Sequence, residues 1–382
     1  MKTWKNLSLI LLLALALAGC RNKSSNLTDF NRSVYTPGYA SGFDVKGADG
    51  RQSVLLTVTN PWQGAEGVET ALFIARDGET APEGFEGQVL EGDARRIVCM
   101  SSTYIAMLDA LGAADRVVGV SGAQYLINET LRRRIARGEA ADVGFDSNVD
   151  FERLMALRPD LVMLFGIGGA DTALTGKLRE LGIPYLYMGE HCEESPLGKS
   201  EWVVVAAEIA GLRTEGSRLF AAIPERYERL RALAQQTAAR PRVMLNTPYR
   251  DTWFMPARNS YMVRLLEDAG ARYIFEENTA TQTLPIDIEQ AYYLTSKSDF
   301  WLNVSGCNTL DEVRRQNPRL ADTPPVREGR VYDNNRRRNA AGGSDFWESG
   351  VLRPDRVLAD LVHIFHPELS ETDELYYYRQ LE

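Results

Sequence analysis

Cysteine and histidine, the residue types that most often ligate metals or attack substrates, are scarce in this chain of 382 residues. Beyond residue 20 there are three widely spaced cysteines, Cys99, Cys192 and Cys307, and no CxxC pair. This odd count does not suggest a disulfide framework, so we expect unpaired, mostly buried thiols. Three histidines are few for a zinc or manganese site. We therefore predict no metal site built from protein side chains.

Two polar clusters could still bind a metal, and each has a simpler interpretation. His363 and His366 are three residues apart near the end of the chain, but no acidic residue stands at ligand spacing beside them. We favour a structural role for this pair. The run from His191 to Glu194 (HCEE) is also polar, and we favour a loop at the junction of two lobes.

Two sequence motifs of enzymes are incomplete. In the glycine-rich stretch 166–171, Asp171 stands where the GxGxxG dinucleotide fingerprint needs its third glycine. The stretch 119–123 (GVSGA) lacks the last glycine of the GxSxG nucleophile elbow. An envelope hydrolase on an α/β frame therefore remains only an alternative hypothesis.

Cys20 closes an export signal. A short basic head precedes an apolar stretch from Leu7 to Leu17, and LAGC follows at residues 17–20. This pattern is typical of a secretory signal, and the apolar stretch is shorter than the about 20 residues that span a bilayer. LAGC resembles the bacterial lipobox, which implies that Cys20 is lipidated and begins the mature protein. We expect a lipid-anchored protein of the bacterial envelope, facing the periplasm; an ordinary signal peptide is the alternative.

Composition is that of a globular protein, with 44% hydrophobic and 25% charged residues. A mature chain of about 360 residues is long enough for two domains. The net charge of −9 argues against nucleic acid as a partner. No second apolar run approaches membrane-spanning length, so the lipid would be the only membrane anchor.

The elements before residue 213 begin with strands and continue as alternating strands and helices. Residues 1–20 are the signal, and residues 21–94 are predicted to form a tether and a small β extension with two strands. Residues 95–212 are predicted to form an N-terminal lobe. Its apolar strands are expected at 97–100, 117–120, 161–165 and 184–188, with helices at 101–111, 151–157, 172–181 and 199–210. This pattern predicts a parallel sheet covered by helices.

A long helix then leads to a second α/β lobe. Residues 213–240 have apolar positions at helical spacing, with Pro224 expected to kink or interrupt the helix. Residues 241–382 repeat the alternation, with a final strand at 330–333 and a last helix at 353–365. The predicted fold class is α/β: two lobes of helix-covered, mainly parallel sheet joined by one long helix, with a small N-terminal β extension.

Five motifs between residues 96 and 369 resemble a known family. The segment 149–163 (VDFERLMALRPDLVM) looks like a motif of the periplasmic substrate-binding proteins of importers for vitamin B12, haem and ferric siderophores. Residues 286–304 repeat it in degraded form. The strand–helix–strand pattern at 97–120, LGIPY at 181–185 and GRVY at 329–332 are similar to further motifs of that family.

The resemblance implies a solute-binding protein that catalyses no reaction and needs no cofactor of its own. Its ligand would be a chelate of iron or cobalt, held in a cleft between the lobes and delivered to an ABC permease and ATPase complex. We expect a monomer. Ferric siderophore or haem is favoured over corrinoid, because the pocket tryptophans of vitamin B12 binders are replaced by Phe145 or Asp146 and by Thr283.

Candidate ligand-binding residues follow the expected ends of strands, which in this fold face the cleft. They are Tyr125, Phe165, Tyr249, Arg250, Trp253 and Arg258. Aromatic rings would stack on a large planar chelate, and arginines would bind its anionic groups. For each aromatic residue, packing in the core is an equally open interpretation. The run 336–338 (RRR) is interpreted as a solvated face, with an anion-binding rim as the alternative.

Glu152 and Glu289 match the two family positions that dock onto arginines of the transporter, one from each lobe. A surface ion pair contributes about 0.2–1 kcal/mol, so two of them would orient a transient complex without locking it. The alternative is that both are solvated glutamates at helix starts. A sensor or partner-binding lipoprotein that kept the fold without transport is a third hypothesis.

Overall fold

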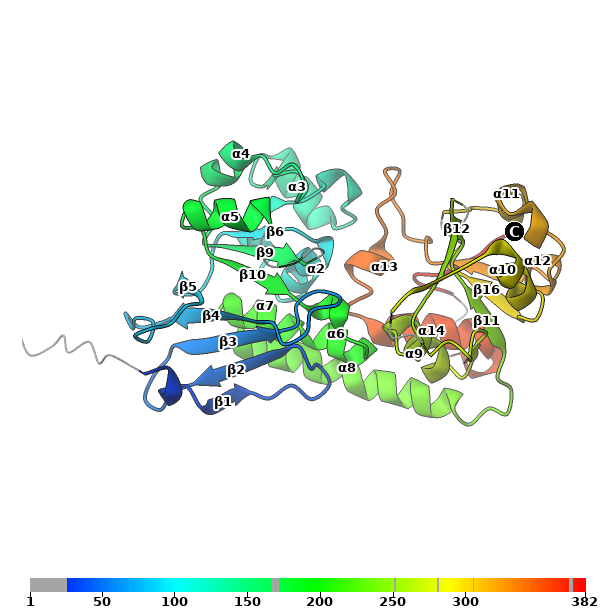
Figure 1. Ribbon diagram of the computed structural model, residues 1–382, viewed down its shortest axis with the longest axis horizontal. Coiled ribbons are helices and arrows are strands. Elements are labelled where there is room, and N and C mark those ends of the chain that lie inside the picture. The colour runs from blue at the N-terminus through cyan, green and yellow to red at the C-terminus, as the bar shows by residue number, and fades with distance from the viewer. Residues whose placement is uncertain are drawn as a thin grey trace, which may run out of the picture.

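The computed structural model describes residues 26–382 except 167–168, 170–171, 251, 280–281, 305 and 371–373. Cys20 and residues 21–25 of the predicted tether lie outside the described residues. Figure 1 shows an N-terminal sheet beside a first α/β lobe and a second α/β lobe at the other end of a long helix. Within the described part of the chain, no helix is both long and apolar enough to cross a membrane.

The N-terminal extension is a complete five-stranded sheet, larger than the two strands that the sequence predicts. In spatial order its strands are β1 (Arg32–Tyr35), β2 (Phe43–Gly47), β3 (Val54–Thr59), β4 (Glu69–Ala75) and β5 (Gln88–Glu91). Strands β1 to β4 pair antiparallel, and β5 joins β4 in parallel. Burial alternates along β2 and β3, as expected for a sheet with one covered face.

The first lobe contains a sheet whose strands are all parallel, in the order β10–β9–β6–β7–β8. The strands are β6 (Ile97–Cys99), β7 (Val117–Val120), β8 (Ala141–Asp142), β9 (Leu161–Phe165) and β10 (Tyr185–Met188). The helices are α2 (Ser102–Ala110), α3 (Glu129–Ala136), α4 (Phe151–Ala156) and α5 (Ala173–Glu180). The central strand β6 is buried along its whole length, which explains its continuous apolar run.

The second lobe contains a sheet in the order β14–β11–β16–β17–β18. Its strands are β11 (Arg242–Leu245), β14 (Arg272–Tyr273), β16 (Phe300–Leu302), β17 (Val331–Asp333) and β18 (Arg379–Gln380). A small antiparallel sheet joins β12 (Pro248–Tyr249), β13 (Thr252–Met255) and β15 (Leu284–Ile286). The prediction that β17 is the final strand is wrong, because β18 pairs antiparallel with it after the last long helix.

Helices cover this second sheet and connect it to the first lobe. They are α9 (Tyr261–Asp268), α10 (Ile288–Thr295), α11 (Leu310–Gln316), α12 (Pro324–Arg327), α13 (Asp345–Glu348) and α14 (Pro354–Phe365). Before them come α6 (Pro196–Glu201), α7 (Val203–Ile209) and the long helix α8 (Arg213–Ala234). Helix α8 continues through Pro224, which was expected to kink or interrupt it, and ends before residue 240. The predicted fold class, two helix-covered lobes joined by a long helix, is confirmed.

Two buried carboxylates of the first lobe hold the loop between β1 and β2. Glu201, at the end of α6, accepts hydrogen bonds from the Tyr35 hydroxyl (2.7 Å) and from the backbone N–H groups of residues 38, 39 and 40 (2.6–2.8 Å). Glu193 accepts bonds from the N–H groups of residues 41 and 42 and from the Trp202 indole. Burial and the bond to Glu201 raise the pKa of Tyr35 above its ordinary value. The extension is therefore bonded into the first lobe.

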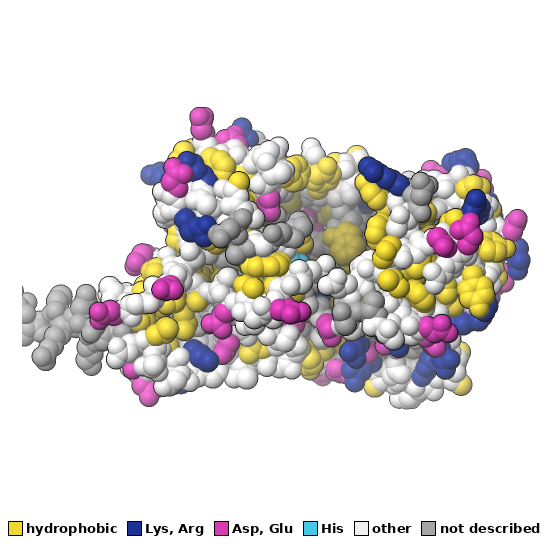
Figure 2. All heavy atoms as spheres, viewed as in Figure 1, with side chains coloured by type: hydrophobic (Ala, Val, Ile, Leu, Met, Phe, Trp, Pro, Cys, Tyr) yellow, Lys and Arg dark blue, Asp and Glu magenta, His cyan; other side chains and the backbone are white. Residues whose placement is uncertain are grey.

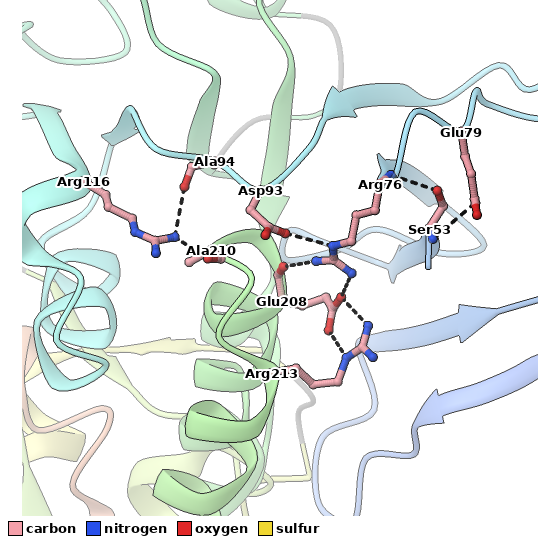
Figure 3. A network of polar contacts seen from close by, with 9 residues as sticks. All are labelled: Ser53, Arg76, Glu79, Asp93, Ala94, Arg116, Glu208, Ala210 and Arg213. Atoms are coloured by element: carbon pink, nitrogen blue, oxygen red, sulfur yellow. Dashed lines mark hydrogen bonds and ion pairs between the residues drawn. The ribbon is translucent and has the colours of Figure 1, made fainter. Parts of the chain in front are cut away.

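A second polar network, shown in Figure 3, joins the extension to the start of α8. The Arg76 guanidinium pairs with Asp93 (2.8 Å) and with Glu208 of α7 (2.7 Å), and Arg213 holds both carboxylate oxygens of Glu208 (2.6 and 2.7 Å). Burial acts to lower the pKa of Arg76, but Glu208 and Asp93 outweigh it and raise that pKa. Glu208 is buried, and its ion pairs with Arg76 and Arg213 offset the cost of removing its charge from water.

The three cysteines of the described residues are free thiols, as expected. Cys99 and Cys307 are buried, and Cys192 is partly exposed. Burial raises the pKa of Cys307 to about 11, and that of Cys99 also rises, so both thiols stay protonated and act as small apolar side chains.

Candidate ligand-binding cleft

A hollow separates the two lobes on the face shown in Figure 2, and α8 runs from one lobe to the other below it (Figure 1). Strands β9 and β10 of the first lobe point toward this hollow, so their carboxyl ends face it. Open parallel sheets bind ligands at the carboxyl ends of their strands. The hollow is therefore the candidate ligand-binding cleft.

Two aromatic rings of the first lobe lie together after β7 and β8. The chain turns sharply at Gly122 (φ 66°), and the Asp142 carboxylate accepts hydrogen bonds from the backbone N–H groups of Gly122 and Ala123. This turn presents Tyr125, whose ring centroid lies 6.3 Å from that of Phe145. Both side chains are more than 40% exposed, so they offer apolar surface that the fold itself does not cover.

Phe165, at the end of β9, contacts an imidazole that the sequence analysis assigned to a loop. Its ring centroid lies 4.3 Å from that of His191, and His191 Nε2 is 3.0 Å from the Gly166 carbonyl oxygen. Burial acts to lower the pKa of His191, but Cys192 and Glu190 outweigh it and raise the pKa to about 9. The imidazole next to the partly buried Phe165 ring thus already has an acidic neighbour, since His191 Nδ1 lies 4.0 Å from the Glu190 carboxylate.

Tyr249 and Arg250 lie together at the turn between β12 and β13. Tyr249 is 67% exposed, and the Arg250 guanidinium lies 5.4 Å from its ring centroid. Arg250 adopts φ 58°, a left-handed conformation that a non-glycine residue seldom takes. This pair offers an aromatic face beside a cation, which suits a planar anionic ligand. Within the described residues, no ring contact, hydrogen bond or ion pair joins this pair to Tyr125 or Phe145.

The other two predicted residues of the second lobe already have partners within the protein. Trp253 is 1% exposed, its indole N–H donates to the Leu245 carbonyl (2.9 Å), and its ring stacks on Trp301. The structure therefore places it in the core, where it has no surface to offer a ligand. Arg258 forms an ion pair with Glu267, so its charge is already balanced.

Trp347 is a candidate that the sequence analysis missed. It lies on α13, which stands between the two lobes in Figure 1, and its side chain is 52% exposed. Figure 2 shows hydrophobic side chains at the bottom of the hollow, in the region where α13 lies. No local pattern could have identified this residue, because its position depends on how a segment of the second lobe packs against the first.

Glu152 and Glu289 occupy the same position in two helices of different lobes. Each is the second residue of its helix, α4 or α10, and the preceding cap is an aspartate, Asp150 or Asp287, whose side chain accepts the N–H of the third helical residue. Both glutamates are exposed. Glu289 pairs with Arg319 (3.0 Å), whereas Glu152 has no ion-pair partner in the described part of the chain.

The histidine clusters have no arrangement suited to a metal. No group of three histidine, cysteine, aspartate or glutamate residues within the described ranges lies close enough to hold one. His366 is buried and contacts the Gly270 carbonyl oxygen (3.2 Å), and His363 contacts the Ser370 hydroxyl (2.9 Å). These contacts agree with structural roles.

Comparisons with known proteins identify a family and relatives of this chain. A family model described as "Periplasmic binding protein" matches residues 97–336. Two uncharacterized lipoproteins of Methanocaldococcus jannaschii are 27% and 22% identical to the chain, covering 74% and 82% of it and 67% and 81% of their own lengths. A periplasmic haem-binding protein from Pseudomonas aeruginosa has a similar structure, with a TM-score of 0.58, 19% identity, and coverage of 76% of this chain and 98% of that protein.

Proposed function

The chain belongs to the periplasmic binding protein family, and from that premise we propose that it captures haem, or another planar chelate of iron or cobalt, and delivers it to an ABC importer. Members of this family bind solutes and catalyse no reaction. The chain is therefore a solute-binding protein, and the hydrolase hypothesis is set aside.

The exposed aromatic surface of the cleft carries the proposal for the ligand. Tyr125 and Phe145 form a half-exposed pair on the first lobe, and Trp347 lies between the lobes. Each stacked aromatic pair adds about 0.5–1.5 kcal/mol beyond the burial of its area, so such walls suit a large flat ligand. The Arg250 guanidinium beside the exposed Tyr249 ring would bind carboxylate groups of the ligand. The haem-binding name of the Pseudomonas protein supports the same ligand class.

The export signal and the names of two relatives support a lipid anchor. LAGC ends the predicted signal at Cys20, and both Methanocaldococcus proteins are named lipoproteins. We propose that lipid on Cys20 holds the protein at the cell envelope, facing the compartment from which the importer takes its substrate. Several acyl chains at about 0.8 kcal/mol per buried methylene would hold it firmly.

Titration of the purified mature protein with haemin, cobalamin and several ferric siderophores tests the ligand class. We expect haemin to raise the melting temperature and shift its own absorption band, because a ligand at 100 times its Kd stabilises the folded state by about 2.7 kcal/mol. Tyr125→Ala should weaken haemin binding about threefold to tenfold, the loss of one aromatic contact. Tyr292→Ala, an exposed aromatic residue on α10, is the matched control. If every chelate leaves the melting temperature unchanged, the proposal is wrong.

Charge reversal at the two matched glutamates tests delivery to the importer. Glu152→Arg combined with Glu289→Arg should leave ligand affinity unchanged, because both side chains are exposed on helices α4 and α10. Stimulation of the ATPase of the cognate permease complex in proteoliposomes should fall at least tenfold, because like charges then meet across the interface. Glu215→Arg combined with Glu225→Arg, at two exposed glutamates of α8, makes the same change in net charge and is the control. Full stimulation by the double variant would exclude these residues as the docking points.

A further inference from the structure

A segment of the second lobe crosses to the first lobe and is bonded to it. Residues 339–348, which we call the strap, follow β17 and end with α13. The Asn339 side-chain amide donates to the backbone carbonyls of Gln124 (3.0 Å) and Leu126 (3.1 Å). Its carbonyl oxygen accepts the N–H groups of Ala341 and Gly343, which fixes the strap's own turn. One side chain thus ties the strap to the loop that presents Tyr125.

Close packing and a further hydrogen bond continue this contact. A Cβ atom on Gly343 would lie only 1.7 Å from the Tyr125 carbonyl oxygen, so the two backbones touch at a distance that only glycine permits. The Thr103 hydroxyl, on α2, donates to the Trp347 carbonyl (3.0 Å). Phe346 is buried against the rings of Tyr377 and Tyr378, which anchors the strap in the second lobe.

A buried carboxylate ends the strap. Glu348 is 3% exposed and accepts the backbone N–H of Ile127 (2.9 Å). Two other carboxylates face it. Asp109 of α2 is bonded by the Asn128 side chain (2.8 Å), and Asp345 of α13 is bonded by Arg337 (2.5 Å).

We propose that the strap is an inter-lobe latch: Asn339 and Glu348 are positioning residues that fix the width of the cleft and hold the Trp347 indole at its base as a ligand-binding surface. The two lobes are also linked through α8, through the packing of α6 against α9 and α14, and by a hydrogen bond from the Asn259 side chain to Glu194. The strap adds a further restraint on rocking of one lobe against the other. The role of Trp347 rests on the proposed function, whereas the latch itself does not.

The chemistry of Glu348 makes the latch sensitive to pH. Burial raises its pKa from 4.5 to about 7; the N–H groups of Ile127 and Asn128 oppose this rise, and Asp345 and Asp109 add to it. In an open form, water would return this pKa toward 4.5. The latched form therefore binds the proton more tightly, so falling pH favours it and a rise through pH 7 weakens it. The latched-to-open ratio should change on the order of 100-fold between about pH 8 and pH 5.

Distances between spin labels on the two lobes test the latch without any ligand. Labels at Met155→Cys and Tyr292→Cys, two exposed positions on α4 and α10, report the separation of the lobes in a Cys192→Ala background. We expect a narrow distance distribution in the unsubstituted protein and a broader one in Asn339→Ala. In the unsubstituted protein, the distribution should become narrower still as the pH falls from 8 to 6. Glu348→Gln, which keeps the side chain's shape but cannot ionise, should remove the pH dependence. Glu312 accepts one backbone N–H within the second lobe, so Glu312→Gln is the control and should behave as the unsubstituted protein.

The latch is wrong if Asn339→Ala leaves the distribution unchanged while circular dichroism shows a folded protein, or if Glu348→Gln keeps the pH dependence. Haemin titration is read separately. Asn339→Ala and Trp347→Ala should each weaken haemin binding at least threefold, and Trp347→Ala should leave the label distances unchanged. An unsubstituted protein that binds no chelate overturns the proposed function but not the latch. Haemin binding that is unaffected by Trp347→Ala overturns the role of Trp347.

Discussion

Replacing Glu201 by alanine is expected to lower the free energy of unfolding by about 3–5 kcal/mol and to release the loop between β1 and β2 from the first lobe. Glu201 is 1% exposed, and its two oxygens accept the Tyr35 hydroxyl and three consecutive backbone N–H groups. Without the carboxylate these donors are buried and unpaired, and each unpaired donor costs about 1–3 kcal/mol, part of which water entering the gap would recover.

Urea unfolding followed by circular dichroism measures this loss, and hydrogen exchange over residues 32–59 locates it. Glu201→Gln keeps the size but has only one accepting oxygen, so an intermediate loss is expected. Glu180→Ala, on the exposed face of α5, should change stability by less than about 0.5 kcal/mol. An unfolding midpoint of Glu201→Ala equal to that of the unsubstituted protein would show that these hydrogen bonds do not hold the extension.

Trp253→Ala is expected to destabilise the protein by about 3–5 kcal/mol, because it removes a large buried ring and leaves a cavity. The Trp253 indole is stacked on Trp301 with ring centroids 5.6 Å apart, and its N–H is bonded to the Leu245 carbonyl. The adjacent Phe254 is 41% exposed, so Phe254→Ala should cost only about 1–2 kcal/mol. Trp253 and Phe254 are neighbours on β13, and only Trp253 is fully buried, so the two variants form a matched pair.

Urea unfolding and haemin titration of both variants distinguish packing from ligand binding. If Trp253 only packs the core, Trp253→Ala should be less stable than the unsubstituted protein. Under conditions in which this variant is folded, it should bind haemin with unchanged affinity. Loss of affinity at unchanged stability would instead support the sequence-based prediction that Trp253 binds the ligand.

The fold could be predicted because its determinants are local. Apolar strands buried on both faces and helices with apolar residues at helical spacing alternate along the chain, and this alternation leaves few alternatives to a helix-covered parallel sheet. The caps are equally local: Asp150 and Asp287 each begin a helix two residues before a matched glutamate. Some predicted elements only changed their ends, as for α8, which ends at Ala234. Short strands were missed altogether, among them three of the five strands of the N-terminal sheet and β18.

The cleft could be predicted only in part, because burial within it depends on distant contacts. Strand alternation in β13 allows either Trp253 or Phe254 to face the core, and only the position of Trp301 decides between them. Arg258 has the charge that an anionic ligand needs, but Glu267 of α9 neutralises it. Trp347 and the strap depend on contacts between residues more than 200 positions apart, which no spacing rule reveals.

The network in Figure 3 means that the minimal folding unit is larger than the region that the family model matches. Excision of everything before residue 97 would remove Arg76 and Asp93 and leave Glu208 buried beside Arg213 alone. It would also remove β3 and β4, whose apolar residues share one buried core with α7, and so expose the apolar side of that helix. A shortened gene product of that kind should be recovered as aggregate, so the extra sheet is an obligate part of this molecule and not a removable module.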